Sequence, residues 1–238
     1  MKNTGILRIQ AFGARQSSPI EGVLVTVSGN GFTAQRITDE TGTAADLSIE
    51  APSCALSLQE DNTIRPYAVV DLTAAKTGFR TVRIQGVQIF AGQVTLAQPE
   101  MIPETEEDRD VVNPPIVIPE HSLFTGDGGS GPDPMENCVP RVLDRVIIPK
   151  NITVHLGKPA ASARNVTVSF RDYIANVASS EVYPTWPEQA LRANIHCQIS
   201  LALNRIYTEW YPSKGYSFNI TNSTSYDQYY VHGRTVFD

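Results

Sequence analysis

Residues 170–191 read FRDYIANVASSEVYPTWPEQAL and predict two successive helices joined by a proline-containing turn. In the first helix, over residues 170–180, Tyr173, Ile174 and Val177 recur at helical spacing, so one face of that helix is apolar. Glu181 follows this segment directly. It is therefore expected at the C-terminal end of the first helix, just before the turn.

The second helix is predicted to begin at Thr185. Thr185 and Glu188 have the spacing of a capping box, in which two side chains satisfy backbone N–H groups at a helix start, and Pro187 suits the first turn. Pro212 and Gly215 end the pattern. Between these points an apolar face is formed by Leu191, Ile195, Ile199, Leu203, Ile206 and Trp210.

Glu181 is the first candidate functional residue. The C-terminal end of a helix dipole disfavours an anion, and burial against Val182, Tyr183 and Trp186 disfavours it further, so we expect the pKa of Glu181 to be raised. A carboxylic acid that stays protonated can act as a general acid. The alternative is a solvated surface glutamate, which is the commoner role of a glutamate near a helix end.

The same stretch resembles the opening part of the stage II sporulation protein D (SpoIID) family of peptidoglycan lytic transglycosylases. That family shows a glutamate, a proline-containing turn and a Trp-Pro-x-x-Ala-Leu type of helix start. Longer runs at residues 176–181, 203–211 and 218–228 are similar to the spore cortex-lytic (SleC-type) branch of the family. The residues that match the broad pattern are Tyr173, Val177, Glu181, Pro184, Trp186, Pro187, Ala190 and Leu191.

This resemblance implies cleavage of the glycan strand between N-acetylmuramic acid and N-acetylglucosamine, with Glu181 as the catalytic residue. One carboxyl group is enough: it protonates the glycosidic oxygen and then, as a carboxylate, helps to remove the proton of the sugar's own C6 hydroxyl, which closes an anhydro ring. No second carboxylate is needed, unlike in most glycoside hydrolases, and no cofactor is expected. Asp172 and Glu188 are accordingly assigned surface or capping roles.

Further residues are candidate substrate contacts. Residues 216–233 resemble the segment that lines the glycan groove in the family. Tyr and Trp rings pack on the apolar faces of sugars, while amides reach hydroxyl and N-acetyl groups. Aromatic residues in strands and turns are also common in cores and at sheet edges, so a packing role is the alternative. The candidates are Tyr183, Trp186, Tyr226, Gln228 and Tyr230.

The first hundred residues predict a different structure, made of short strands. Runs rich in Val, Ile, Thr and aromatic residues alternate apolar with polar positions and are separated by turn residues, which is typical of an antiparallel β-sandwich. Residues 19–27 followed by residues 38–42 resemble the carboxypeptidase-regulatory or transthyretin-like sandwich, and we interpret this region as a folding, docking or inhibitory module. The predicted strands are Ile6–Phe12, Gly22–Ser28, Phe32–Thr38, Thr43–Ile49, Tyr67–Thr73, Arg80–Ile84 and Val87–Leu96.

Residues 99–150 are rich in Pro, Gly and acidic residues and predict a linker. Exposed flexible segments are where proteases cut, and the resemblance implies activation by cleavage in this region. The expected domains are therefore a sandwich over residues 1–98, a linker or pro-segment over residues 99–150, and a SpoIID-like region over residues 151–238. The fold class is α+β, with a mainly helical C-terminal region that we expect to be incomplete, because the family's catalytic domain extends beyond the equivalent of Asp238.

Composition bears on the kinds of partner expected. The 238-residue chain has a formal charge of -6, so it lacks the excess of basic residues typical of nucleic-acid-binding proteins. No apolar stretch is long enough to span a bilayer. Its three cysteines are widely spaced, so free thiols are expected. No metal site is expected, since adjacent His196 and Cys197 diverge on a helix. No signal-peptide core precedes the first strand, and the resemblance implies production in the mother cell and a place in the spore cortex or outer layers.

Three interpretations stay open from the sequence. The first is a precursor of a lytic transglycosylase that acts on spore cortex, with glycan strands and an activating protease as partners. The second is a catalytically silent wall-binding or amidase-enhancing module. The third is a structural spore protein in which the sandwich is the functional part.

Overall fold

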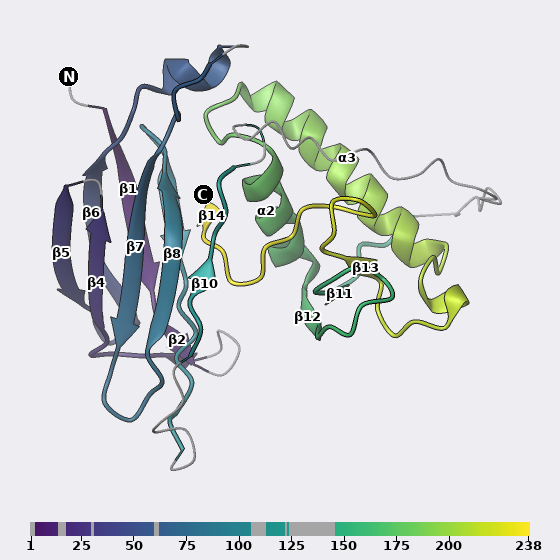
Figure 1. The fold of residues 1–238 in the computed structure, drawn as a ribbon, viewed down its shortest axis with the longest axis horizontal. Coiled ribbons are helices and arrows are strands. Elements are labelled where there is room, and N and C mark those ends of the chain that lie inside the picture. The colour runs from purple at the N-terminus through teal and green to yellow at the C-terminus, as the bar shows by residue number, and fades with distance from the viewer. Residues whose placement is uncertain are drawn as a thin grey trace. The chain divides into compact units, whose positions relative to one another are not determined.

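The computed structural model describes residues 3–13, 18–29, 31–59, 62–105, 113–121, 123 and 146–238 (Figure 1). Among these residues most regular structure is β-sheet and two α-helices accompany it, so the expected α+β class is confirmed. The chain forms two compact units. The N-terminal unit comprises Met1–Glu120, Tyr183–Trp186 and Gly233–Asp238, and the C-terminal unit comprises His121–Val182 and Pro187–His232.

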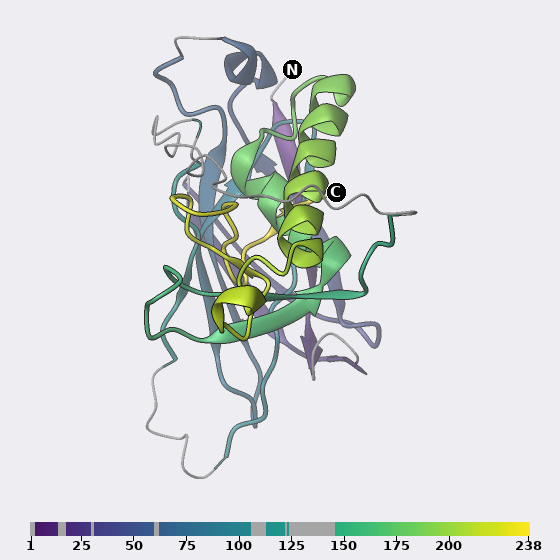
Figure 2. The ribbon, with the colours of Figure 1, turned by 90° about the vertical axis from the view of Figure 1, so that its right-hand side faces the viewer.

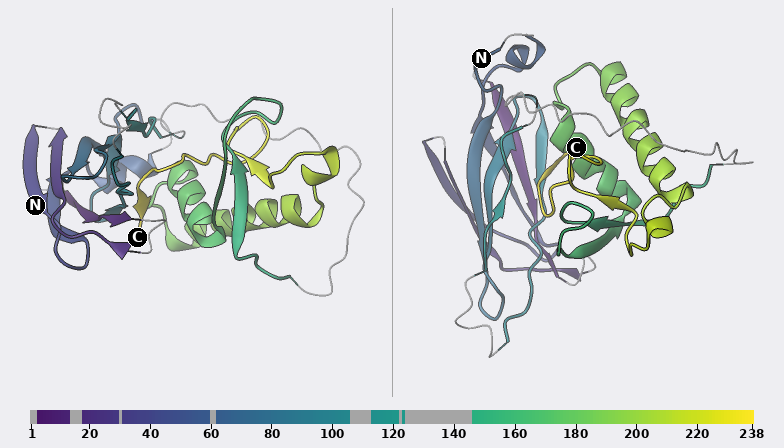
Figure 3. Two further views of the ribbon diagram at one scale, coloured as in Figure 1. Left: turned by 90° about the horizontal axis from the view of Figure 1, so that it is seen from below. Right: turned by 45° about the vertical axis from the view of Figure 1, so that its right-hand side comes forward.

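Two sheets build the N-terminal unit, and Figure 3 shows their layers from two further directions. The first has the order β14-β9-β1-β6, with β14 at Val236–Phe237, β9 at Val94–Ala97, β1 at Thr4–Gln10 and β6 at Thr43–Glu50. The second has the order β10-β8-β7-β4-β5, with β10 at Ile116–Val117, β8 at Val82–Ile89, β7 at Ala68–Ala75, β4 at Leu24–Gly29 and β5 at Phe32–Ile37. A short pair, β2 at Phe12–Gly13 and β3 at Ser18–Pro19, and a 3-10 helix at Cys54–Leu58 complete the unit.

Alternation along these strands explains the core. Every second side chain of a strand points to the same face, and Leu7 and Ile9 of β1 and Val25 and Val27 of β4 are fully buried. Side chains from both sheets join in one apolar cluster, so the two sheets face each other across a common core. Most strand pairs are antiparallel, as the sequence predicts, but β1 pairs with β9 and β8 pairs with β10 in parallel.

Part of the predicted linker belongs to this unit. Met101 is fully buried and Ile118 is 3% exposed, and both join the core of the two sheets. The backbone N–H of Arg80 donates to Ile102 O at 2.8 Å. The prediction of a linker over residues 99–150 is therefore wrong for residues 99–105 and 113–120. Apolar side chains in these two ranges pack into the core, although prolines surround them in the sequence. The glycine-rich run at residues 126–132 lies outside the described residues.

The C-terminal unit combines a small sheet with two helices (Figure 2). The sheet has the order β12-β11-β13, in which β11 pairs with β12 antiparallel and with β13 in parallel. A mainly helical region is thus not confirmed. The elements are β11 at Asn151–His155, β12 at Asn165–Ser169, α2 at Phe170–Glu181, α3 at Glu188–Tyr207, a 3-10 helix at Pro212–Lys214 and β13 at Ile220–Thr221.

The helix α2 begins where β12 ends, and Ser169 caps it by accepting the backbone N–H of Asp172 at 3.0 Å. The apolar face that the sequence predicts is buried, with Tyr173 and Val177 fully enclosed beside Ile152 and Ile220 of the sheet. This packing fixes α2 on the sheet and leaves Glu181 as the last residue of the helix.

The predicted capping box at the start of the second helix is wrong. The helix α3 begins at Glu188, with Pro187 before it and no side-chain cap. Glu188 instead forms an exposed ion pair with Arg192 at 2.7 Å, and the Thr185 hydroxyl lies 2.7 Å from the Ser57 hydroxyl within the N-terminal unit. Thr185 is occupied by that distant partner, which a local capping pattern does not reveal.

Candidate functional site

Glu181 is held at both of its carboxyl oxygens. Gln198 of α3 donates its side-chain N–H to Oε2 at 2.9 Å, and the backbone N–H of Tyr229 donates to Oε1 at 2.8 Å. The carboxyl group therefore connects α2, α3 and the C-terminal segment of the unit, and its orientation is fixed from two sides.

The environment of Glu181 favours the protonated form. The residue is half-buried, and loss of solvation raises its pKa above the usual value, while the hydrogen bonds from Tyr229 and Gln198 oppose this shift. The direction is the one that the sequence predicts. A carboxyl group of this kind can donate a proton and afterwards accept one.

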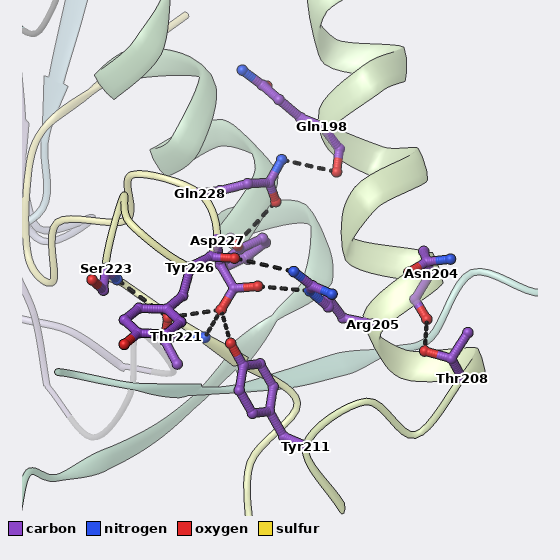
Figure 4. Close-up of polar contacts among 11 residues, drawn as sticks. Gln198, Asn204, Arg205, Thr208, Tyr211, Thr221, Ser223, Tyr226, Asp227 and Gln228 are labelled. Atoms are coloured by element: carbon purple, nitrogen blue, oxygen red, sulfur yellow. Dashed lines mark hydrogen bonds and ion pairs between the residues drawn. The ribbon is translucent and has the colours of Figure 1, made fainter. Parts of the chain in front are cut away.

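A chain of buried amides supports this arrangement. Gln198 is 5% exposed, and its backbone oxygen accepts the side-chain N–H of Gln228 at 3.1 Å (Figure 4). Gln228 in turn accepts the hydroxyl of the fully buried Tyr173 at 3.0 Å. Burial raises the pKa of Tyr173, so its hydroxyl stays a donor. The partner of Glu181 on α3 is thus fixed by contacts to α2 and to the C-terminal segment.

The turn before Tyr229 is anchored by a buried ion pair between Asp227 and Arg205 (Figure 4). Arg205 Nε lies 2.7 Å from Asp227 Oδ1, and the side chains are 4% and 0% exposed. The second oxygen, Oδ2, accepts the Tyr211 hydroxyl at 2.5 Å and both the N–H and the hydroxyl of Thr221, at 3.0 and 2.7 Å. This cluster holds the segment that supplies the backbone donor to Glu181.

The candidate substrate contacts divide into exposed and buried residues. Tyr226 is 43% exposed and open to a ligand. Gln228 and Tyr230 are 5% and 4% exposed, and the Tyr230 ring stacks on Tyr173 with centroids 5.5 Å apart. Burial raises the pKa of Tyr230 to about 12. Gln228 and Tyr230 therefore have the packing role that the sequence left open as the alternative to substrate binding.

Tyr183 and Trp186 belong to the N-terminal unit. Tyr183 is 6% exposed and packs on Phe90 at a centroid distance of 5.5 Å, and burial raises its pKa to about 12. Trp186 donates its indole N–H to the backbone oxygen of Ser57 at 3.1 Å. These contacts give both rings a packing function inside that unit.

Four residues of this site were not predicted from the sequence: Gln198, Arg205, Asp227 and Tyr229. Gln198 had a signal: it follows Ile195 by three residues and precedes Ala202 by four, so it is a polar residue on the buried face of α3. The pairing of Arg205 with Asp227 had no local signal, because it depends on the return of the chain after β13.

No group of three or more metal-binding side chains is gathered within the described part of the chain. Cys54 and Cys197 are free and exposed, and Cys138 lies outside the described residues. No described helix has the length and apolar character to cross a membrane.

No protein-family model matches this sequence, and no curated protein matches it. Part of the chain resembles solved structures at TM-scores near 0.3, which support no functional assignment. The Bacillus anthracis TIE protein has 13% identity and a TM-score of 0.31, over 42% of this chain and 17% of that one. Catechol 1,2-dioxygenase from Acinetobacter sp. ADP1 has 14% identity and a TM-score of 0.32, over 49% and 59%. Klebsiella pneumoniae 5-hydroxyisourate hydrolase has 21% identity and a TM-score of 0.26, over 42% and 94%.

Proposed function

We propose that this chain is part of a peptidoglycan lytic transglycosylase precursor of the SpoIID type, in its SleC-type branch, and that Glu181 is its catalytic acid. One observation supports the proposal most: the Glu181 carboxyl group is half-buried, oriented from both sides, and has a raised pKa. The match of residues 170–191 to the family pattern supports the substrate class.

In the proposed reaction, protonated Glu181 donates its proton to the glycosidic oxygen between N-acetylmuramic acid and N-acetylglucosamine. The bond to the leaving sugar breaks, and the carboxylate then accepts the proton of the C6 hydroxyl as that oxygen closes the anhydro ring. The N–H groups of Gln198 and Tyr229 stabilise the carboxylate between these steps. Exposed Tyr226 is the proposed substrate contact among the aromatic candidates.

The N-terminal unit is proposed to be a transthyretin-like module that docks or inhibits, and cleavage between residues 99 and 150 is proposed to activate the precursor in the spore. Because residues 99–105 and 113–120 belong to the N-terminal unit, the proposed cut falls outside these two ranges. The segment concerned lies largely outside the described residues.

The test compares wild type with Glu181→Gln on purified cortex sacculi. Glu188→Gln is the matched control, because Glu188 is an exposed glutamate at the start of α3 that pairs only with Arg192 among the contacts described. Mass spectrometry should detect anhydro-muropeptide ends with wild type and with Glu188→Gln, and a loss of at least a hundredfold with Glu181→Gln. Equal release by all three proteins would disprove the assignment of Glu181.

A second candidate is the silent wall-binding or amidase-enhancing module. It is favoured by the two hydrogen bonds to Glu181, because they also suit a glutamate that only fixes the segment after β13. The same experiment separates the two functions: sedimentation with sacculi without any anhydro product from wild type would favour the binding module.

A further inference from the structure

The C-terminal unit has a concave site apart from Glu181, with a cavity volume of about 340 Å³. Its polar wall is formed by His155, Asn165 and Ser217, and its aromatic wall by Tyr216 and Phe218. Small side chains of residues 159–163 close the remaining side. Neither Glu181 nor any of its partners lines this cavity.

The cavity and Glu181 are formed by different segments of the chain. His155 ends β11 and pairs with Asn165, the first residue of β12, whereas α2 begins only after β12 has ended. Glu181 is the last residue of this helix, and twelve residues span about 18 Å at 1.5 Å per residue. The chain from the cavity to Glu181 therefore runs through β12 and the whole of α2.

His155 is the unusual residue of the cavity. It is 5% exposed, stacks on Phe218 with centroids 4.6 Å apart, and its Nδ1 lies 2.7 Å from Asn165 Oδ1. Because an amide oxygen only accepts, Nδ1 holds the proton, and Nε2 of the neutral ring is an acceptor. Nε2 is buried and has no hydrogen-bond partner among the described residues, and a buried acceptor without a donor is costly.

Gly157 lies close to two alanines of the cavity wall and to this acceptor. A Cβ at Gly157 would lie 3.7 Å from His155 Nε2, 3.0 Å from the Ala163 Cβ and 3.3 Å from the Ala161 Cβ. Ala161 and Ala163 both line the cavity. Any side chain at residue 157 would therefore push against the two alanines of the cavity wall.

The lining selects the kind of ligand. No cavity residue has a permanent charge, which disfavours phosphate, carboxylate or metal ligands. A half-buried tyrosine ring, alanine methyl groups and three polar side chains on one wall suit a neutral ring with hydroxyl and amide groups. An N-acetylated amino sugar has this chemistry, because its hydroxyl and amide groups can bond to the polar wall and its methyl group can contact alanine.

We propose that this cavity binds an N-acetylated amino sugar of a glycan strand, at a subsite apart from Glu181, against the polar wall of His155, Asn165 and Ser217. The proposal rests on the proposed function for the identity of the ligand. Such a subsite would hold the chain on its polymer while the reacting linkage lies elsewhere.

The experiment titrates the N-acetylglucosamine trimer into the ¹⁵N-labelled Glu181→Gln chain, followed by NMR. Shift changes are expected at Ser217, Phe218 and the Asn165 side-chain amide. Asn165→Ala should weaken binding at least fivefold. Asn151→Ala is the matched control, because Asn151 is an exposed asparagine at the other end of the same hairpin, where it pairs with Ser169.

Gly157→Ala tests the alanine wall, because the added Cβ would displace Ala161 and Ala163, and it should weaken binding at least tenfold while the remaining spectrum keeps its dispersion. The proposal is overturned if the trimer causes no shifts at the cavity, or if Asn165→Ala and Asn151→Ala bind equally. Cleavage of sacculi without trimer binding would remove the cavity proposal alone, whereas trimer binding without cleavage would remove only the catalytic function of Glu181.

Discussion

Asp227→Ala is predicted to destabilise the C-terminal unit strongly. The Asp227 side chain is 0% exposed, and its two oxygens accept four hydrogen bonds, from Arg205, from Tyr211 and twice from Thr221. Alanine removes the acceptor for all four donors at once. It also leaves the guanidinium of Arg205 buried without its counter-ion.

The expected loss follows from these contacts. Breaking a buried ion pair by removing one partner costs about 3–5 kcal/mol, because the other charge stays buried. Arg205 keeps a bond to the backbone oxygen of Tyr226 and its contact with the Trp210 ring at 4.4 Å, which favours the lower half of that range. Since domains are stable by about 5–15 kcal/mol, the change removes a large part of the free energy of unfolding.

Urea unfolding followed by Trp210 fluorescence measures this loss. The chain has two tryptophans, and Trp186 belongs to the N-terminal unit, so a Trp186→Phe background leaves a probe in the C-terminal unit. With a denaturant slope of about 1–3 kcal/mol per molar urea, the midpoint of Asp227→Ala should fall by at least about 1 M. Asp172→Ala, an exposed aspartate of the same unit, should change it little.

Two results would refute this reasoning. One is a loss below about 1 kcal/mol for Asp227→Ala. The other concerns the double variant Arg205→Met with Asp227→Leu, which removes both charges and should regain much of the stability, because apolar pairs often replace buried ion pairs without loss. A double variant that is no more stable than Asp227→Ala would show that the unpaired charge is not the cause.

Three further predictions concern Glu181 and the N-terminal sheets. Burial raises the folded-state pKa of Glu181, so its protonated form contributes stability that is fully present below pH 4.5 and is lost as the pH rises through the raised pKa. Curves of unfolding free energy against pH should show this decline for wild type and not for Glu181→Gln. Parallel curves for the two proteins would contradict the prediction. Gln198→Leu should raise the pKa of Glu181 further, because the hydrogen bond that it removes stabilises the carboxylate. ¹³C NMR titration of the Glu181 carboxyl carbon measures this pKa, and an unchanged value would show that the hydrogen bond is absent in solution. Gly86→Ala should destabilise the N-terminal unit by about 1–3 kcal/mol, because its φ is +81° and a Cβ would lie 2.3 Å from Ile118 O. Gly78→Ala, with φ +82° and no atom within 4 Å of its Cβ, should lose about 1 kcal/mol less in thermal unfolding; equal losses would show that the contact with Ile118 is unimportant.

Local patterns predicted most elements because they depend on near neighbours. The strands β1, β4, β5, β6 and β7 lie within about two residues of their predicted ranges, and α2 lies at Phe170–Glu181. The strand β8 runs without interruption across the break predicted between Ile84 and Val87, and β3 was not predicted. The sequence predicted one strand over Val87–Leu96, but a turn at residues 90–93 separates β8 from β9 there. The capping box failed because Thr185 contacts a residue 128 positions away.

The sequence alone determined the α+β class, the strand rhythm of the first hundred residues, and the position of Glu181 at a helix end. These features follow from side-chain periodicity over one or two turns, which needs no knowledge of the partner. The atoms that hold the Glu181 carboxyl group depend on the folded chain, since its donors lie 17 and 48 residues away. The Asp227 cluster and the cavity at His155 were decided in the same way, because distant segments meet there only after the sheet has formed.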